Sequence, residues 1–386
     1  MSTAAACQEE TASRSAVLPS RLQLLNATIC FKRFLMRGIF IDEFFPRGVR
    51  ASAQGLFNLM ILGFGPLVVN AIGPNRYETP LYHYEANRLS MACVYAIDAY
   101  GPDAAALPRI LDDAFDEVDR IDRLMSHYKS DSPLSRINRE AARHPVTVDP
   151  ELFDFIAESR RYDRESGGAF DITVGPLMKA WGFFRGEGRK PSDEELSAAR
   201  RHVGGAHLVL NPAGKTIAFD DAGVELDLGG IAKGYAVDRV VALLRQRHVA
   251  AALVSAGGST IYGLGTPPGH DGWDVAVQDP IDPRRVALTV TLRDRALSVS
   301  GSSEKSFESG GVRYSHIMDP RTGRPVQGVL SVAVLTRRAT AGDALDNAFF
   351  VLGPDHSRPY LHTLPGTEAF FFVPAGRGWR VIHRPS

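Results

Sequence analysis

The chain has 386 residues, enough for one large domain or two of ordinary size. Hydrophobic residues make up 44% of it, which suffices for a sizeable core. Lys and Arg number 44 together, and so do Asp and Glu, so the formal net charge is zero and the basic bias of nucleic-acid binders is absent. The three cysteines, Cys7, Cys30 and Cys93, are spaced too widely for a metal-binding pair or a disulfide framework.

The first eighty residues differ in character from the rest. Residues 55–73 contain no charged side chain, and as a helix rising about 1.5 Å per residue they are just long enough to cross a bilayer core. Arg47 and Arg50 precede them, and residues 69–71 have the small-residue pattern of a signal cleavage site. The segment is either a signal or anchor, placing the chain in the periplasm or on the periplasmic side of the inner membrane, or an apolar segment of a cytoplasmic protein. We expect residues 1–80 to be a variable region and residues 81–386 to form the main domain.

The main domain shows strand and helix patterns in an irregular order. Residues 91–100 alternate and are rich in Val, Ile and Tyr, as in a strand, and apolar side chains recur at helical spacing over 107–128. Because strands and helices do not alternate strictly, we expect an α+β domain and not a doubly wound sheet. Helices are expected over 107–128, from 150 to the glycine pair 167–168, and over 192–203, 231–248 and 340–352; strands over 91–100, 170–176, 207–210, 216–219, 225–228, 251–254, 312–317, 330–335, 369–373 and 379–383, with more before residue 299.

Residues 225–238 carry the most informative pattern. A short apolar strand holds Asp227, two glycines follow, and the first turn of a helix contains Lys233 and Gly234. Backbone N–H groups at a helix start favour anions, and paired glycines let a ligand approach the main chain. The order of a Walker A loop is absent. The pattern favours a nucleotide or dinucleotide site; the alternative is an ordinary strand–turn–helix corner.

Three further segments carry chemistry. His316, beside a tight turn at 319–323, is either a general base or a structural histidine. Thr340, Asp343 and Asn347 share one helix face and offer oxygen ligands suited to Mg²⁺, although the first turn of a helix often carries Thr and Asp without a metal. The glycine turn at 255–259 is either close to a flavin or phosphate or a plain turn between strands.

Six short motifs occur in order between residues 91 and 353. They are Ser126-x-Tyr128 with Ser132-x-x-Ser135, the run 170–177 (FDITVGPL), the run 227–238 (DLGGIAKGYAVD), Val254-Ser-x-Gly-Gly258, His316-Ile-x-Asp-Pro-x-Thr-Gly323 and Ala339-Thr-Ala-x-Asp-Ala-Leu345. Together they resemble the ApbE family of FAD:protein FMN transferases. The first eighty residues lie outside this resemblance.

The resemblance implies an α+β fold with a mixed sheet and packed helices, similar to the T-fold. It also implies an enzyme that uses Mg²⁺ to transfer FMN from FAD to a Thr or Ser of an acceptor flavoprotein, a subunit of a membrane redox complex, with release of AMP. Carried over by position, the metal ligands would be the carbonyl of Gly230, Asp343 and Asn347, with Thr340 a weaker candidate, and His316 would be the base. The FAD site would be lined by Met91, Tyr128, Ala169, Phe170, Asp171, Asp227, Lys233 and Ile317.

Three positions depart from the family pattern. This chain has Ala92-Cys93 where the family commonly has Gly-Thr, Asn347 where it usually has Thr, and Ser259 where it has Asp or Asn. An amide oxygen still ligates Mg²⁺, so we expect metal binding to persist more weakly. Two alternatives to the transferase remain open: an FAD pyrophosphatase that gives FMN and AMP, and a non-catalytic FAD-binding protein.

Overall fold

The computed structural model describes residues 80–186, 188–303 and 305–386. The chain divides into two units between Phe57 and Asn58, and all described residues belong to the second. The candidate signal or anchor at 55–73 lies outside the described residues, so its nature stays a prediction. Within the described residues no helix is both long and apolar enough to span a bilayer.

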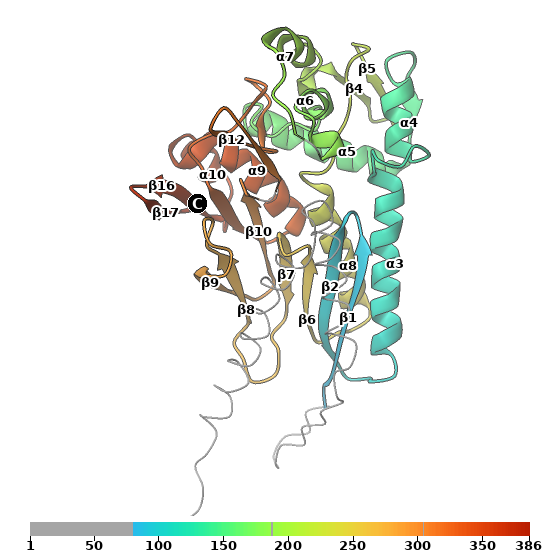
Figure 1. Ribbon diagram of the computed structural model, residues 1–386. Helices are drawn as coiled ribbons and strands as arrows, with labels where there is room; N and C mark the ends of the chain where they lie inside the picture. The colour runs from blue at the N-terminus through green and yellow to red at the C-terminus, as the bar shows by residue number, and fades with distance from the viewer. Residues whose placement is uncertain (1–79, 187, 304) are drawn as a thin grey trace, which may run out of the picture. The chain divides into compact units, whose positions relative to one another are not determined.

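The domain is built on one eight-stranded sheet (Figure 1). The strand order is β1-β2-β6-β7-β10-β15-β16-β17, and every neighbouring pair is antiparallel. The central strands β6, β10 and β15 are rich in Ala, Val, Leu and Ser, which suits positions covered on both faces. The bounds are β1 Tyr82–Ser90, β2 Cys93–Gly101, β6 Ala251–Ala256, β7 Thr260–Leu264, β10 Arg295–Gly301, β15 Ser331–Thr336, β16 Glu368–Ala375 and β17 Gly378–Pro385.

Three helices cover one face of this sheet (Figure 1). They are α3 (Leu107–Met125), α8 (Ala232–Gln246) and α9 (Ala339–His356), and α8 packs between the other two. In α3 the buried side chains recur every three or four residues, which confirms the amphipathic helix. Helix α9 breaks at Gly353, whose φ is 70°, and Pro354 follows the break.

A helical subregion follows α3 in the chain and lies beyond one end of the sheet (Figure 1). Its helix α7 begins at Ser192 with both bonds of the predicted capping box, from Glu195 N–H to Ser192 Oγ and from Ser192 N–H to the Glu195 carboxylate. The bounds here are α4 Pro133–Glu140, β3 Val146–Thr147, α5 Pro150–Glu165, α6 Gly175–Ala180, η2 Phe183–Arg185, α7 Asp193–Arg200, η3 Gly205–His207, β4 Leu208–Asn211 and β5 Thr216–Phe219.

The opposite face of the sheet is partly covered by the hairpin of β8 and β9. Trp273, Val275 and Val277 alternate inward from β8 and form a second core with Leu297 and Phe372 of the main sheet. The remaining bounds are β8 Trp273–Gln278, β9 Val286–Leu292, β11 Ser306–Ser309, β12 Val312–Ser315, β13 Met318–Asp319, β14 Arg324–Pro325 and α10 Arg358–Leu361.

The α+β class is confirmed, and most expected elements are present with ends shifted by a few residues. Two expected strands are wrong. Residues 170–174 form turns and residues 175–176 begin α6, because Asp171 Oδ1 accepts hydrogen bonds from the N–H and hydroxyl of Thr173. Residues 225–228 make only an isolated bridge between Glu225 and Val174. Strand β1, which precedes Met91, was not expected.

Candidate functional site

The predicted metal-binding residues lie where α8 and α9 pack in opposite directions. Three residues of α9 contact three positions in or just before the first turns of α8. As the position on α9 advances, its partner lies four residues earlier in the chain each time. Thr340 Oγ1 donates to Asp238 Oδ2 at 2.6 Å, and Asp343 Oδ2 accepts from Gly234 N–H at 2.9 Å. Asn347 Nδ2 lies 3.3 Å from the carbonyl oxygen of Gly230. Thr340, Asp343 and Asn347 therefore lie on one face of α9, as their spacing predicted. This face points toward α8.

Asp343 is the buried charge at the centre of this contact. Its side chain is 3% exposed, and its two oxygens accept from Gly234 N–H and, at 3.1 Å, from Thr260 Oγ1. Burial raises the pKa of Asp343, and the nearby Lys233 ammonium opposes that rise. Each oxygen keeps a lone pair beyond its hydrogen bond, so the carboxylate retains room to ligate a cation.

The donor set around Gly230 fits a hard cation. A main-chain carbonyl, a carboxylate and an amide oxygen are the ligands that Mg²⁺ takes. The Asn347 amide nitrogen faces Gly230 O and also lies 2.9 Å from Asp343 O. Rotating this amide by half a turn would present its oxygen at the same place, and the two orientations are nearly equivalent in shape. Thr340 is held instead by Asp238, which also accepts from the N–H groups of Ala339 and Thr340 and caps α9.

Lys233 and His316 approach the same region from different elements. Lys233 lies in the first turn of α8, and its Nζ donates to Ser259 Oγ at 2.6 Å, in the glycine turn between β6 and β7. His316 follows β12, and its backbone N–H donates to Lys305 O at 2.9 Å. The His316 ring nitrogen Nδ1 also lies 3.3 Å from Lys305 O. Since a carbonyl only accepts, this contact places the proton on Nδ1 and leaves Nε2 as the free base.

The imidazole of His316 is held in its neutral form. Burial, together with the positive charges of Lys305 and Lys233, lowers the pKa of His316 to about 4, and the hydrogen bond to the Lys305 carbonyl opposes only part of this shift. Phe183 packs edge-on against the ring, with the two centroids 6.4 Å apart. A neutral imidazole at pH 7 can accept a proton, as a general base requires.

Asp227 lies beside a cluster of aromatic side chains formed by His127, Tyr128 and Phe184. Its Oδ1 accepts from Gly229 N–H at 2.8 Å and lies 3.3 Å from His127 Nδ1. The Tyr128 ring is 60% exposed and stacks on Phe184 with centroids 5.3 Å apart. A stacked aromatic pair with one exposed ring, beside a carboxylate, suits a ligand that carries a flat heteroaromatic ring and hydroxyl groups.

The other predicted FAD-site residues lie within the core or at its margin. Ala169, Phe170 and Asp171 are 2%, 5% and 7% exposed, and Phe170 Cε2 lies 3.6 Å from the position that a Cβ on Gly230 would take. Ile317 is buried next to His316. Met91 occupies the β1–β2 turn, where its sulfur accepts a hydrogen bond from Tyr95 Oη at 3.1 Å.

Comparison with known proteins identifies the family of this chain. The model of the family described as ApbE family matches residues 91–371. The chain belongs to the ApbE family. It is 35% identical over 289 residues to the FAD:protein FMN transferase of Treponema pallidum, covering 71% of this chain and 80% of that protein. The FAD:protein FMN transferase of Escherichia coli K12 is 34% identical over 295 residues, covering 74% and 82%.

Solved structures of ApbE proteins share the fold. The crystal structure of the Thermotoga maritima ApbE protein has a TM-score of 0.71 at 30% identity and covers 78% of this chain and 96% of that one. The flavin transferase ApbE from Vibrio cholerae has a TM-score of 0.71 at 30% identity, with 79% and 97% covered. A second family model, described as nucleoside H+ symporter, matches residues 11–99, most of which lie outside the described residues.

Some site residues of this ApbE-family chain were not found from the sequence. His127 and Phe184 carried no motif of their own, and only folding brings them to Asp227 and Tyr128. Asp238 ends the 227–238 motif. Its partners are at the start of α9, and the sequence does not show that α9 packs beside α8. Ser259 was noted as part of the glycine turn at 255–259 and as a departure from the family pattern, but its role as the hydrogen-bond acceptor for Lys233 was not predicted.

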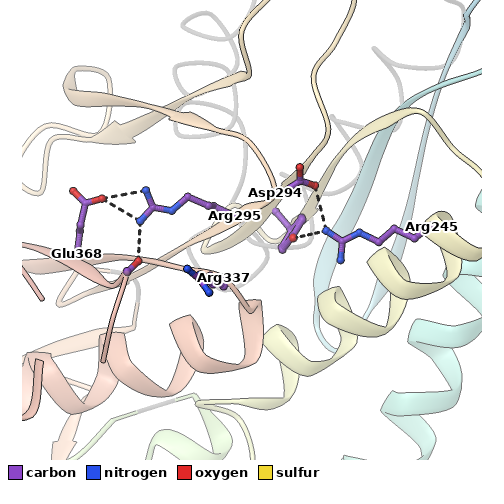
Figure 2. Close-up of a pocket in the computed structure, with 7 residues that line it drawn as sticks. Arg245, Asp294, Arg295, Arg337 and Glu368 are labelled. Carbon is purple, nitrogen blue, oxygen red and sulfur yellow. Dashed lines mark hydrogen bonds and ion pairs between the residues drawn. The ribbon is translucent and has the colours of Figure 1, made fainter. Parts of the chain in front are cut away.

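A pocket of about 530 Å³ lies at the other end of α8 and contains none of the predicted site residues (Figure 2). Arg245, in the last turn of α8, donates to Tyr262 Oη and Asp294. Arg295 donates to Glu368 and to the carbonyl of Gly366. The charges of Arg245 and Arg295 are thus paired within the pocket, whereas Lys233 and Gly234 lie at the start of α8.

Proposed function

We propose that this chain transfers the FMN part of FAD to a Thr or Ser hydroxyl of an acceptor flavoprotein. The reaction forms a phosphoester between the FMN phosphate and the hydroxyl oxygen, breaks the pyrophosphate P–O bond, and releases AMP. The observation that carries the proposal is the convergence of Asp343, Lys233 and His316 at the start of α8, in a chain that belongs to the ApbE family.

FAD would bind across the glycine pair at the start of α8. The stacked rings of Tyr128 and Phe184 would hold one aromatic ring of FAD, and Asp227 would accept hydrogen bonds from ribityl or ribose hydroxyls. The N–H groups at the start of α8 and the Lys233 ammonium favour the pyrophosphate. The remaining walls would come from Met91, Ala169, Phe170, Asp171 and Ile317.

Gly230, Asp343 and Asn347 would hold Mg²⁺ through the Gly230 carbonyl and the two side chains. The bound ion supplies neutralisation of the negative charge on the pyrophosphate. Lys233 adds a fixed positive charge, and its bond to Ser259 Oγ orients the ammonium. Burial of Asp343 keeps competing water away from the carboxylate.

His316 would be the base. Its Nδ1–H donates to Lys305 O, and Nε2 accepts the proton of the acceptor hydroxyl as the new P–O bond forms. Because burial and the two lysines hold the ring neutral, the base is ready at neutral pH. Asp319, three residues on, accepts from the N–H groups of Thr322 and Gly323 through its carbonyl and closes the turn that ends this segment.

We further propose that residues 81–386 form the transferase domain and residues 1–80 a variable region with a signal or anchor at 55–73. This would place the domain in the periplasm or on the periplasmic side of the inner membrane, with an acceptor subunit of a membrane redox complex as its partner. The uncharged run at 55–73 supports this, and so does the symporter-family match over 11–99.

The test measures AMP released from FAD in the presence of an acceptor flavoprotein domain, with Mg²⁺ or EDTA. AMP should appear in a one-to-one ratio with modified acceptor, only with Mg²⁺, and Asp343→Ala should abolish it. Asp355→Ala, which removes an exposed carboxylate just beyond the break in α9, is the control and should release AMP at the wild-type rate. Release that neither EDTA nor Asp343→Ala affects would remove the metal role.

A further inference from the structure

The hairpin of β1 and β2 forms a free edge of the main sheet (Figure 1). It carries three side chains of types that can hold a metal ion, His83, Glu85 and Asp98. His83 and Glu85 are two residues apart on β1 and so lie on one face of it. Asp98 is the register partner of Glu85 on β2. Tyr82 and Ala86, on the other face of β1, pack against the main core, so the cluster faces away from α3.

The three side chains lie close enough to reach one ion, although His83 and Asp98 are hydrogen-bonded to each other and must move apart to admit it. His83 Nε2 lies 2.7 Å from Asp98 Oδ1 and 3.3 Å from Glu85 Oε1, and the ligand atoms of all three lie within 4.8 Å of one another. Two ligands on a tetrahedral zinc ion with bonds of 2.0–2.1 Å are separated by about 3.4 Å. Only small rotations about side-chain bonds are therefore needed to admit an ion.

The two carboxylates of the cluster share His83 as their partner and have no arginine or lysine beside them in the part of the chain that the structure describes. Glu85 and Asp98 face each other directly across the strand pair, an arrangement that costs stability for like charges. Within the described residues, no Lys or Arg nitrogen lies within 4.0 Å of either carboxylate. By contrast Arg88, on the other face of the same strand, pairs with Asp112, Asp116 and Asp119.

The His83 ring is held in place before any ion binds. It stacks on Tyr100, with ring centroids 4.7 Å apart and an interplanar angle of 26°. Tyr100 is itself packed against the second core, so it is a firm support. Preorganisation of this kind lowers the entropy cost of binding.

We propose that His83, Glu85 and Asp98 bind a divalent transition-metal ion of the zinc class. An imidazole ligand favours Zn²⁺ over Mg²⁺ and Ca²⁺, which prefer oxygen donors alone. Three protein ligands leave a fourth position for water. The ion would neutralise the opposed carboxylates and tie β1 to β2. This site is separate from Asp343 and does not depend on the proposed flavin transfer.

The experiment is a competition titration of the metal-free full-length protein with Zn²⁺ against a chromophoric chelator. Wild type should show one site that His83→Ala and Glu85→Gln each weaken about tenfold or more. His144→Ala, which removes an exposed histidine elsewhere, should leave that site unchanged. Glu85→Gln keeps the shape of an exposed side chain, so it separates loss of a ligand from loss of folding.

A second measurement uses Co²⁺ in place of Zn²⁺. Wild type and His144→Ala should give the visible absorption of a low-coordinate cobalt site, and His83→Ala should not. Flavin transfer should remain at the wild-type rate in His83→Ala. Zinc binding that is the same in wild type, His83→Ala and Glu85→Gln would overturn the proposal, as would the absence of any such site in wild type.

Discussion

At the residue scale, one ammonium group acts on several titratable groups. The charge of Lys233 opposes the burial that raises the pKa of Asp343, and it adds to the burial that lowers the pKa of His316. Cys93 also lies in this field, where burial raises the pKa of its thiol to about 11. Lys233 therefore favours an ionised carboxylate and a neutral imidazole together, the two states that the proposed chemistry needs.

The first prediction concerns the pH dependence of transfer. Because the base must be unprotonated and the pKa of His316 is lowered to about 4, kcat/KM should stay level as the pH falls from 7 to 5 and decline only near pH 4. Lys305→Met removes a charge that holds this pKa down, so the decline should move to higher pH. Lys190→Met, an exposed lysine elsewhere, is the control. A wild-type decline centred near pH 6.5 would contradict the assignment.

At the element scale, the close approach of α8 and α9 depends on one glycine. A Cβ on Gly234 would overlap Ala339 O and lie 2.8 Å from the Cβ of Asp343. The absence of a side chain there allows Gly234 N–H to reach the Asp343 carboxylate. The spacing of these two helices therefore sets the geometry of the candidate metal ligands.

The second prediction is that Gly234→Ala separates these helices. The free energy of unfolding should fall by about 1–3 kcal/mol, since the overlap with backbone outweighs the better helix propensity of Ala. Transfer activity should fall with it, because the bond to Asp343 is lost. Gly214→Ala, in the exposed turn between β4 and β5, adds a Cβ at ordinary contact distance and should change stability by no more than about 0.5 kcal/mol. Equal effects of the two substitutions, measured by denaturant unfolding, would refute this account.

The third prediction concerns the β1–β2 turn. Met91 and Ala92 form a two-residue loop with φ of 49° and 58°, where glycine is favoured. Ala92→Gly should raise the free energy of unfolding by about 0.5–1 kcal/mol, because the left-handed strain of Ala exceeds the entropy cost of glycine. Ala96→Gly, within β2, should lower it instead. Loss of stability in both variants would show that the turn is not strained.

At the scale of the whole molecule, strong local signals predicted most elements. The amphipathic pattern of α3 and the capping box of α7 are encoded within a few turns of chain and were confirmed. Strand β1 was not expected, although Tyr82, Tyr84 and Ala86 alternate with polar residues in its sequence YHYEANRLS. The expected strand at 170–176 does not form because the Asp171 carboxylate accepts a hydrogen bond from the N–H of Thr173. That N–H therefore needs no partner on a neighbouring strand.

The site could be predicted only in part. The motif words located Asp343, Lys233 and His316, but their partners come from distant segments: Thr260, Ser259 and Lys305. Spacing alone placed Thr340 on the same helix face as Asp343 and Asn347. It could not show that the Thr340 hydroxyl donates a hydrogen bond to Asp238. Roles for the predicted site residues remain proposals that rest on this geometry and on family membership.

The intact mass of the acceptor tests the central claim most directly. The protein is incubated with FAD, Mg²⁺ and an acceptor flavoprotein domain. The acceptor should gain the mass of FMN minus water, and replacing its Thr or Ser by Val or Ala should prevent the gain. His316→Ala should slow the gain by about 10²–10⁴-fold while FAD still binds. Free FMN and AMP with an unmodified acceptor, or FAD bound but uncleaved, would contradict the account.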